Sequence, residues 1–404
     1  MADTQKPHIV IAGGGVAAIE ALLALRDLAG ERLSIELVAP EAEFSYRPLS
    51  VSAAFDIGDA PRFDLATIAA DLRASHRVGA IVAIQPDRRM AWTESGEEVP
   101  YDVLVLATGA KSEEAVPGAL TFRGNEDLHD FKQLIEDLER GRVETVAFAV
   151  PSGTTWSLPA YELALMTAAR LRAEGNNAAV KFVTPEATPL ALFGRAASDA
   201  VAALMKSRGI ETLASVHPVE FAGRALTTVP RGSIEADRVV ALPRLTGRPI
   251  EGVPRDGSGF IEVGPLGEVQ GIPDVYAAGD GTAGSIKQGG VATQQADTVA
   301  AAIAARFGAP VQPAPFRPVL RGTLLTGDGA QYLRNEVSGG RGERSEISAQ
   351  ILWWPKGKIA GRHISDYLAR RAHPVEPDQP LPADAIPVDV ELPSDRTGAD
   401  VRVA

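Results

Sequence analysis

The sequence predicts an α/β protein with two parallel-sheet domains, the first split around the second, and a small α+β domain near the C-terminal end. Three observations support this fold class. A buried strand, a glycine turn and a helix follow one another from Ile9 onward. A second strand–helix pair begins near Val143, and a second glycine segment lies at 275–281. Strands that alternate with helical stretches are typical of parallel sheets.

The first glycine segment has the pattern of a dinucleotide-binding turn. Residues 9–12 are apolar and partly β-branched, as in a buried strand, and Gly13, Gly15 and Ala18 then match G-x-G-x-x-[GA]. Gly13 permits the tight turn, Gly15 lets a pyrophosphate approach the backbone, and Ala18 allows close helix–strand packing. We expect a helix from Val16 to about Leu28, ended by Gly30, whose first N–H groups, near Val16 and Ala17, face a diphosphate. The alternative is a glycine-rich turn that only packs a helix.

One position departs from this fingerprint. The next predicted strand, 34–38, ends at Ala39 and Pro40, where an Asp or Glu usually binds a ribose hydroxyl. Glu41 follows directly and could reach the ribose if Pro40 bends the chain. The alternative, equally weighted, is that Glu41 is a solvated loop acid.

Composition limits the remaining function classes. The chain has 404 residues, which predicts two or three domains, and a net charge of −12, which argues against a general nucleic-acid binder. No long apolar run predicts a transmembrane helix, and the polar N-terminus predicts no signal peptide. The absence of cysteine excludes disulfides, thiolate nucleophiles and Cys-ligated metal centres, and the six histidines show no ligand spacing, so we expect no metal site.

Three motifs in order carry a resemblance to a known family. They are the G-x-G-x-x-A start, Tyr-Asp-Val-Leu-Val-Leu-Ala-Thr-Gly-Ala at 101–110, and Val-Tyr-Ala-Ala-Gly-Asp at 275–280. The chain resembles the flavoproteins with two Rossmann-like dinucleotide-binding domains, in which an FAD domain is split by an inserted NAD-type domain. Within them it is most similar to the sulfide:quinone oxidoreductase and type II NADH dehydrogenase branch. Residues 98–110 read as one buried strand that ends in a small-residue turn, after a small antiparallel excursion at 81–84 and 89–92.

The resemblance implies FAD as cofactor and assigns roles to residues. Gly13, Gly15 and Ala18 would hold the pyrophosphate, and Ala107, Thr108 and Gly109 would mark the crossing between domains. Gly279 and Asp280 would close the site, with the Asp280 carboxylate facing the ribityl chain; an N-cap role for Asp280 is the alternative and is compatible.

The segment after Asp280 is expected to start a helix that ends near Arg306. In the family this helix start faces the pyrimidine edge of the flavin, where its N–H groups stabilise negative charge. Lys287 and Gln288 are the side-chain candidates near the ring. The alternative for Lys287 is a lysine on a surface loop.

The middle domain lacks the second glycine fingerprint. A strand is expected at 143–150, but the following loop, 151–159, keeps only Gly153 and contains Trp156, which is too large for close approach of a nicotinamide dinucleotide. NAD(P)H is therefore the less favoured electron donor. Glu162, near the expected helix start, is either a proton-transfer group beside the flavin or a charge that complements the helix dipole.

Sulfide chemistry in that branch uses cysteines, which this chain lacks. We therefore expect an FAD-dependent oxidoreductase that passes electrons from an unidentified small-molecule donor to a quinone-like or protein acceptor. The alternatives are an NAD(P)H-dependent flavoprotein reductase and a flavin-binding protein without redox turnover.

In the family the segment 44–49 packs beside the isoalloxazine, so Tyr46 could stack or donate a hydrogen bond and Arg47 could bind an anionic group. Ordinary packing is the alternative for both.

The C-terminal region is expected to form a smaller domain, with strands at 322–326 and 349–354. The basic, aromatic stretch 353–371 is either a peripheral membrane contact or, as favoured, a cover for the flavin site or a dimer contact; Ile364, Tyr367 and Leu368 could share a helix face. The expected domains are 1–118 with 240–315, then 119–239 and 316–373, followed by an extended tail, 374–404. We expect a cytoplasmic protein, monomer or homodimer, with or without peripheral membrane contact.

Overall fold

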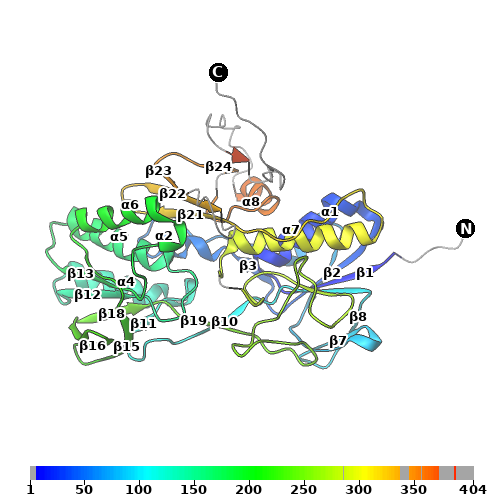
Figure 1. The fold of residues 1–404 in the computed structure, drawn as a ribbon, viewed down its shortest axis with the longest axis horizontal. Coiled ribbons are helices and arrows are strands. Elements are labelled where there is room, and N and C mark those ends of the chain that lie inside the picture. The colour runs from blue at the N-terminus through cyan, green and yellow to red at the C-terminus, as the bar shows by residue number, and fades with distance from the viewer. Residues whose placement is uncertain (1–5, 285, 337–344, 356, 373–385, 388–404) are drawn as a thin grey trace, which may run out of the picture.

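The computed structural model describes residues 6–284, 286–336, 345–355, 357–372 and 386–387. Two α/β lobes lie side by side, and the C-terminal strands and helix lie across the junction between them (Figure 1). The tail that the sequence predicts to be extended falls outside the described residues, apart from 386–387.

The first lobe is built on a five-stranded sheet in which every neighbouring pair is parallel. Its strand order is β20-β9-β1-β2-β5, so the strand closest to the C-terminus completes a sheet begun by the first strand. The predicted split domain is thus visible in the strand order. The strands are β1 His8–Ala12, β2 Ser34–Ala39, β5 Ser75–Val78, β9 Val103–Leu106 and β20 Val275–Ala277.

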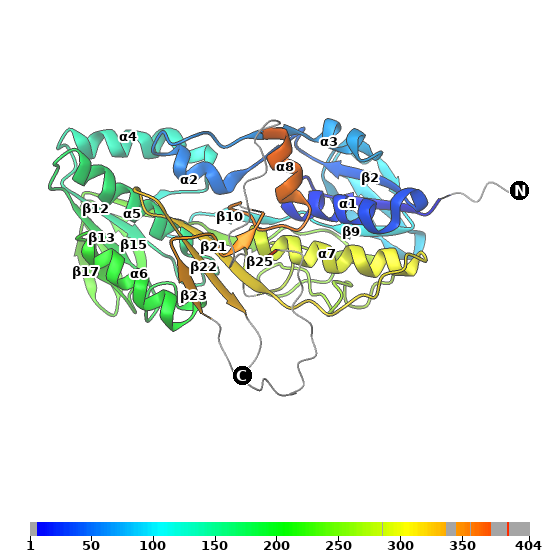
Figure 2. The ribbon, with the colours of Figure 1, turned by 90° about the horizontal axis from the view of Figure 1, so that it is seen from above.

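Two alanine-rich helices, α1 (Val16–Ala29) and α7 (Gly289–Arg306), pack side by side against this sheet (Figure 2). Small side chains on both helices allow the close contact, and their apolar faces form one core with the sheet. Helix α1 begins at Val16 as predicted and ends one residue after the predicted Leu28, and α7 ends at Arg306 as predicted but begins only at Gly289. Helix α3 (Leu65–Asp71) and the strand pair β3 (Glu43–Ser45) and β4 (Arg62–Asp64) flank this core.

The other face of the first sheet is covered by a three-stranded antiparallel sheet, β6 (Ile81–Gln85), β7 (Met90–Thr93) and β8 (Glu98–Pro100). The prediction of one strand over 98–110 is wrong. Residues 98–100 pair with β7, whereas 103–106 form β9 in the parallel sheet, because Tyr101 and Asp102 carry the chain from one sheet to the other.

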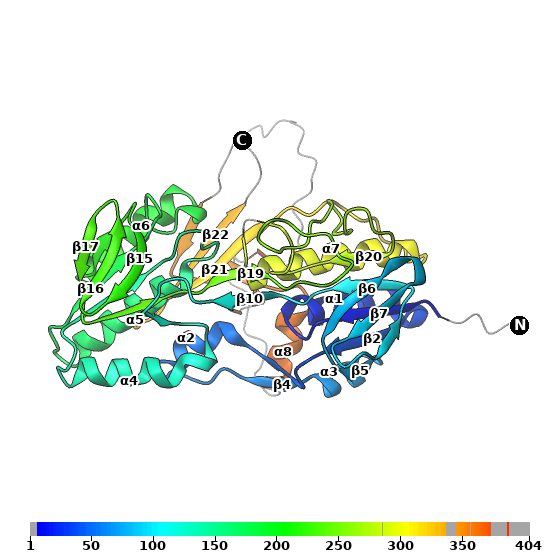
Figure 3. The same cartoon turned by 90° about the horizontal axis from the view of Figure 1, so that it is seen from below.

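The second lobe repeats the parallel arrangement in the order β11-β18-β12-β13-β14. Its strands are β11 Leu120–Thr121, β12 Thr145–Ala149, β13 Ala179–Val183, β14 Glu211–Leu213 and β18 Arg238–Ala241. Its helices are α2 Ser50–Ala53, which is contributed by the first part of the chain, α4 Leu128–Glu139, α5 Leu158–Ala173 and α6 Arg195–Ser207. An antiparallel sheet of β15 His217–Ala222, β16 Ala225–Val229 and β17 Gly232–Glu235 lies at its end (Figure 3).

An antiparallel pair, β10 (Ala110–Glu113) and β19 (Arg244–Gly247), connects the two lobes. The chain leaves the first lobe along one strand of this pair and returns along the other. Short 3-10 helices complete the described elements: η1 Gly30–Arg32, η2 Arg47–Leu49, η3 Pro86–Arg88, η4 Asn125–Asp127 and η5 Ala191–Phe193.

The C-terminal part forms an antiparallel sheet of β21 (Val319–Leu325), β22 (Ala330–Glu336) and β23 (Glu346–Ser348). The predicted strand at 322–326 is confirmed, but the one at 349–354 is reduced to β24 (Trp353–Trp354), which pairs with β25 (Ile386–Pro387). Helix α8 (Ile364–Ala372) buries Ile364 and Leu368 against the core of the first lobe. The predicted apolar face of this helix is therefore covered by protein. No helix among the described residues is long and apolar enough to cross a membrane.

Candidate functional site

The first glycine turn lies where three strands of the first lobe end. Gly13 has a φ of +126°, and a Cβ atom there would come within 2.2 Å of the Ala107 carbonyl oxygen. The Gly13 N–H donates to the Val38 carbonyl at 2.7 Å, which fixes the turn against β2. Both the conformation and the close approach require glycine at this position.

Helix α1 begins directly after this turn with an uncapped N-terminus. Gly15 is the N-cap residue, no side chain caps the helix, and its first turn holds no acidic residue. A Cβ atom on Gly15 would meet nothing within 4 Å, so open space lies in front of the helix. Ala18 is fully buried. Free N–H groups, the positive end of the helix dipole and open space together form an anion-binding site.

The second glycine segment meets the first one here. A Cβ on Gly279 would lie 2.9 Å from the Ala17 side chain, and a Cβ on Gly281 would lie 3.0 Å from the Gly109 carbonyl oxygen. The Gly279 N–H donates to Gln295 on α7 at 2.8 Å. The two glycine segments, far apart in the sequence, therefore belong to one site. Thr108 lies between Ala107 and Gly109 on the same crossing segment and is partly buried.

Two charged residues, Asp280 and Lys287, lie just before the start of α7, and the Lys287 ammonium donates to the Thr282 carbonyl. Burial raises the pKa of the Asp280 carboxyl, and the charges of Lys287 and Arg47 and a hydrogen bond from the Gln288 backbone oppose this rise. Burial lowers the pKa of Lys287, which is 4% exposed and lies 3.9 Å above the Phe260 ring. The interpretation of Lys287 as a surface lysine is wrong, because its side chain is buried, with the ammonium bonded to the Thr282 carbonyl and lying over the Phe260 ring.

Gln288 caps helix α7 with its side chain. Its Oε1 accepts from the Val291 N–H at 2.8 Å, and its Nε2 donates to the Arg321 carbonyl at 3.0 Å. The N-cap role considered for Asp280 thus belongs to Gln288, eight residues later in the chain. This leaves the Asp280 carboxylate directed toward the cavity described next.

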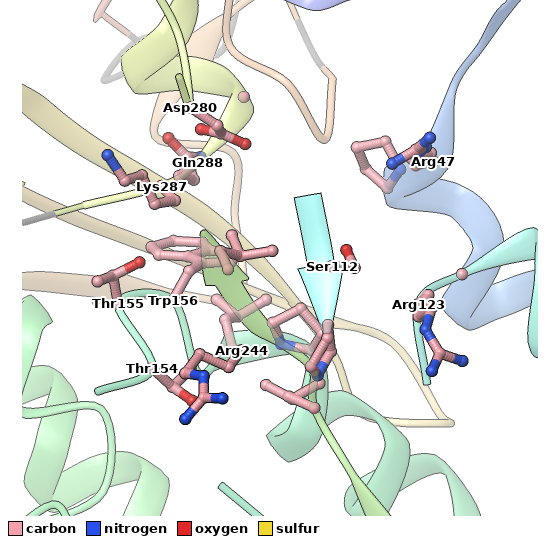
Figure 4. A pocket seen from close by; sticks show the side chains of 18 of the residues that line it. Arg47, Ser112, Arg123, Thr154, Thr155, Trp156, Arg244, Asp280, Lys287 and Gln288 are labelled. Carbon is pink, nitrogen blue, oxygen red and sulfur yellow. The ribbon is translucent and has the colours of Figure 1, made fainter. Parts of the chain in front are cut away.

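A cavity of about 780 Å³ opens between the two lobes (Figure 4). Asp280, Gly284 and residues 287–289 line one side, and the loop 153–159 with Glu162 lines the other. Asp280, Lys287 and Gln288 lie across from Thr154, Thr155 and Trp156 in this view, with Arg47 and Arg123 on a third side. Further lining residues include Ser112, Arg244, Asp256, Lys358 and Ile359.

Glu162 forms a buried ion pair on the wall of this cavity. Its side chain is 0% exposed, its Oε2 accepts from Lys358 Nζ at 2.6 Å, and its Oε1 accepts from the Leu325 N–H at 2.9 Å. Burial raises the pKa of Glu162, and the Lys358 ammonium counteracts part of this rise. The pair joins α5 of the second lobe to the C-terminal region. The sequence did not reveal Lys358, because it is one of several basic residues in a stretch that resembles a solvated face.

The corresponding turn of the second lobe lines the cavity but carries a large aromatic side chain. Trp156 packs edge-on against Phe193 at a centroid distance of 5.6 Å. Glu186, just after β13, accepts hydrogen bonds from Ser157 Oγ at 3.1 Å, Tyr161 Oη at 2.6 Å and Thr184 Oγ1 at 3.0 Å. The acid that follows the second strand is therefore engaged with the start of α5 itself. Sequence reasoning missed Glu186, although an acid after a second Rossmann strand is a usable signal.

The remaining predicted residues lie around the same region. The Tyr46 hydroxyl accepts from the Ile359 N–H at 2.9 Å, and burial raises the pKa of Tyr46 to about 12. Arg47 is exposed at the cavity edge, and Glu41 is exposed beyond the end of β2. Tyr46 is thus bonded to the backbone of the C-terminal region. The predicted role of Tyr46 in catalysis and the predicted role of Glu41 in ribose binding both stay predictions.

A second buried carboxylate was not expected from the sequence. Glu20 on α1 is 0% exposed and accepts from the His363 N–H at 2.8 Å and the Ile364 N–H at 2.6 Å. Asp297 and His363 lie beside it, with their potential ligand atoms and that of Glu20 within 4.8 Å of one another. Burial raises the pKa of Glu20 to about 7. Both oxygens of Glu20 hold the start of α8, which explains why a carboxylate is buried there.

The residues around the glycine turns fit FAD. A pyrophosphate can approach the open space at Gly15, and the half-buried Asp280 carboxylate, which lines the cavity, offers acceptors to a polyol. When bound, the flavin supplies hydride and electron transfer.

Comparison with known proteins agrees with this geometry. The family model of the pyridine nucleotide-disulphide oxidoreductases matches residues 7–296. A sulfide-quinone reductase of Aquifex aeolicus (strain VF5) is 29% identical over 189 residues, which are 44% of this chain and 43% of that protein. The sequence match thus spans less than half of that relative. NADH dehydrogenase-like protein MT1860 of Mycobacterium tuberculosis (strain CDC 1551 / Oshkosh) is 27% identical over 294 residues, 68% of this chain and 72% of that protein.

Solved structures show the same fold at lower identity. The X-ray structure of the sulfide:quinone oxidoreductase from Aquifex aeolicus superposes with a TM-score of 0.75 at 21% identity, covering 85% of this chain and 87% of that one. Putidaredoxin reductase, in its covalent complex with putidaredoxin, gives a TM-score of 0.62 at 18% identity over 83% of each chain. With the family model extending over both lobes, the chain belongs to the pyridine nucleotide-disulphide oxidoreductase family and is an FAD-dependent oxidoreductase.

Proposed function

We propose that this protein passes electrons through FAD from a small-molecule donor other than NAD(P)H to a quinone-like or protein acceptor, without cysteine chemistry. Gly13, Gly15 and Ala18, with the N–H groups at Val16 and Ala17, would hold the pyrophosphate. Gly279 and Asp280 would hold the ribityl side. Lys287 and the start of α7 would place positive charge beside the ring. Glu41, Arg47, Gln288 and the crossing segment Ala107, Thr108 and Gly109 complete the proposed binding residues.

The hydrogen bonds that Glu186 accepts are the main argument against NAD(P)H as the electron donor. An NAD site of this type usually has an acid after the second strand that binds the ribose hydroxyls, and a small turn before the helix. In the second lobe the acid accepts from Ser157, Tyr161 and Thr184, and Trp156 occupies the turn. Binding of NAD(P)H would have to break these contacts, which disfavours it as donor.

The cavity supports a polar donor or acceptor beside the flavin. Lys287, Arg47 and Arg244 line it together with Asp256 and Asp280, so it offers hydrogen-bond donors and acceptors at one site. Glu162 is a carboxyl group with a raised pKa on the wall, and it is the residue we assign to proton transfer. Tyr46, whose hydroxyl accepts from the Ile359 N–H next to the cavity, would assist this proton transfer.

The quinone-like or protein acceptor rests on the relatives. A sulfide-quinone reductase and a reductase in complex with putidaredoxin share this fold, and their names give a quinone and a small protein as redox partners. The stretch 353–371 stays the proposed place of any peripheral membrane contact, although the burial of Ile364 and Leu368 leaves its helix without a free apolar face.

Two other functions have specific support. The match to an NADH dehydrogenase-like protein over most of the chain favours an NAD(P)H-dependent reductase. Because the chain lacks the cysteines of the sulfide chemistry, a flavin-binding protein without redox turnover stays the second alternative.

Anaerobic stopped-flow absorbance of the FAD-loaded protein separates these functions. We expect NADH and NADPH to leave the visible flavin band unchanged while dithionite bleaches it, and a reduced flavin to be reoxidised rapidly by a soluble quinone. Rapid bleaching by NADH would overturn the proposal in favour of the reductase. A reduced flavin that neither a quinone nor a redox protein reoxidises faster than buffer alone would favour the non-redox function.

A further inference from the structure

The antiparallel sheet of the C-terminal region has two different faces. Leu320, Leu324 and Leu333 point toward the core of the second lobe. The alternate residues of the same strands point the other way, and we name this side, with Arg321, Thr323, Tyr332 and Arg334, the outer face. Arg321 and Arg334 are direct partners in the register of β21 and β22, so their side chains emerge next to each other.

The two arginines of the outer face are both buried but differ in their partners. Arg334 is 2% exposed, and its Nη atoms contact Glu336 at 3.0 Å and Glu346 at 3.2 Å. Arg321 is 5% exposed, and no carboxylate of the described residues forms an ion pair with it. Burial, followed by the charge of Arg334, lowers the pKa of Arg321 to about 10.

Buried donors without acceptors gather on this face. The Nε atoms of Arg321 and Arg334, the Thr323 hydroxyl and the Trp353 indole nitrogen are all buried and have no hydrogen-bond partner in the described part of the chain. Trp353 belongs to the same place, because its ring lies edge-on against Tyr332 at 5.5 Å. Most buried polar groups in proteins are bonded, so several orphans side by side indicate an acceptor that binds there.

We propose that the outer face binds a small oxyanion, a phosphate or a carboxylate, between Arg321 and Arg334, with Thr323 and Trp353 as neutral donors. The guanidinium group of Arg321 is suited to bind either anion through two parallel hydrogen bonds. Glu336 and Glu346 are already engaged by Arg334 and do not supply this acceptor. Thr323 also lines the cavity between the lobes, whereas Arg321, Arg334 and Trp353 are not among the residues that line it.

The test is thermal unfolding and isothermal titration of the full-length, FAD-loaded protein with sodium phosphate, sodium acetate and sodium chloride at equal ionic strength and pH. We expect phosphate or acetate to raise the melting temperature beyond chloride, with saturation, and the stronger of the two identifies the anion class. Equal shifts in all three salts would overturn the proposal.

Variants assign the effect to the site. Arg321→Met keeps the length of the side chain without its charge and should abolish the oxyanion-specific shift. Arg317→Met, at an exposed arginine just before the same strand, should retain the shift. If Arg321→Met does not fold, Thr323→Val and Trp353→Phe provide the test, because losing one hydrogen bond to a charged ligand should weaken binding about tenfold. Unchanged dissociation constants in both variants would contradict the site.

Discussion

The two parallel-sheet lobes begin with the same strand, turn and helix, yet their turns differ in the size and the partners of their side chains. At the start of α1 the chain leaves open space in front of Gly15 and no side chain caps the helix. The start of α5 is also uncapped, but its turn carries Trp156, which packs against Phe193 and lines the cavity, and Ser157 is bonded to Glu186. This difference is the basis of our proposal that only the first lobe binds a dinucleotide cofactor.

The two helices also share a feature. Each carries a glutamate at its fifth residue that is 0% exposed, Glu20 on α1 and Glu162 on α5. Both glutamates contact the same C-terminal stretch: Glu20 accepts from the backbone at His363 and Ile364, and Glu162 accepts from Lys358. The C-terminal region is thus held to both lobes by equivalent buried carboxylates.

The largest expected effect tests the difference between the two turns. Gly13→Ala would place a Cβ atom within 2.2 Å of a carbonyl oxygen at a φ of +126°, so we expect a loss of about 4 kcal/mol or more in the free energy of unfolding. The purified variant should also be colourless. Urea unfolding and the visible spectrum measure both effects.

Gly153→Ala is the matched control in the second lobe. Gly153 has a φ of +80°, but a Cβ there meets nothing within 4 Å. The expected cost is therefore only the strain of a left-handed residue, about 1–2 kcal/mol, with FAD retained. Equal losses in the two variants would show that conformation, and not the close approach at Ala107, determines the need for Gly13.

The next effect concerns the Glu162–Lys358 pair. Lys358→Met leaves a fully buried carboxylate without its cation, which should lower the free energy of unfolding by about 3–5 kcal/mol. In the double variant, Glu162→Gln removes the buried charge while its amide oxygen still accepts from the Leu325 N–H. This second substitution should restore most of the free energy of unfolding that Lys358→Met loses. Urea unfolding of the single and double variants measures the coupling, and additive losses would contradict a direct ion pair.

The sequence predicted the elements around this pair but not the pair itself. The strand, glycine turn and helix of the first lobe follow from local patterns, and so do α7 and the position of Lys287 near its start. Lys358 meets Glu162 only through the packing of the C-terminal region on α5, and no local pattern encodes that contact. The same reason explains why Glu186 and Glu20 were missed: each is recognised by its burial and partners, which depend on the tertiary structure.

Glu20 predicts a pH dependence. Burial raises its pKa from 4.5 to about 7, so between these values the folded protein holds a proton that the unfolded chain has lost. The free energy of unfolding should therefore fall as pH rises from about 4.5 to about 7, by up to about 3 kcal/mol from this group. Glu20→Gln should remove this part of the pH profile.

The measurement is urea unfolding of both proteins across this pH range, with Glu174→Gln, an exposed acid at the end of α5, as control. The difference between wild type and Glu20→Gln should change with pH, while that of the control stays constant. A constant difference for Glu20→Gln would mean that the carboxyl group is ionised throughout this range in the folded protein.

The smallest effect compares the acids that follow the second strand of each lobe. Glu186→Gln keeps an acceptor for the hydroxyl groups of Ser157 and Tyr161 but loses the negative charge, so we expect a cost of about 1 kcal/mol in unfolding and no change in FAD affinity. Glu41→Gln, at the exposed acid after β2, should leave the free energy of unfolding within about 0.5 kcal/mol of wild type and weaken FAD binding, as a ribose contact requires. Urea unfolding and FAD titration of the two variants therefore give opposite patterns if one acid is structural and the other binds the cofactor. If Glu41→Gln binds FAD as tightly as wild type, Glu41 is a solvated loop acid, and the first lobe binds its cofactor through the glycine turn and Asp280 without a ribose acid.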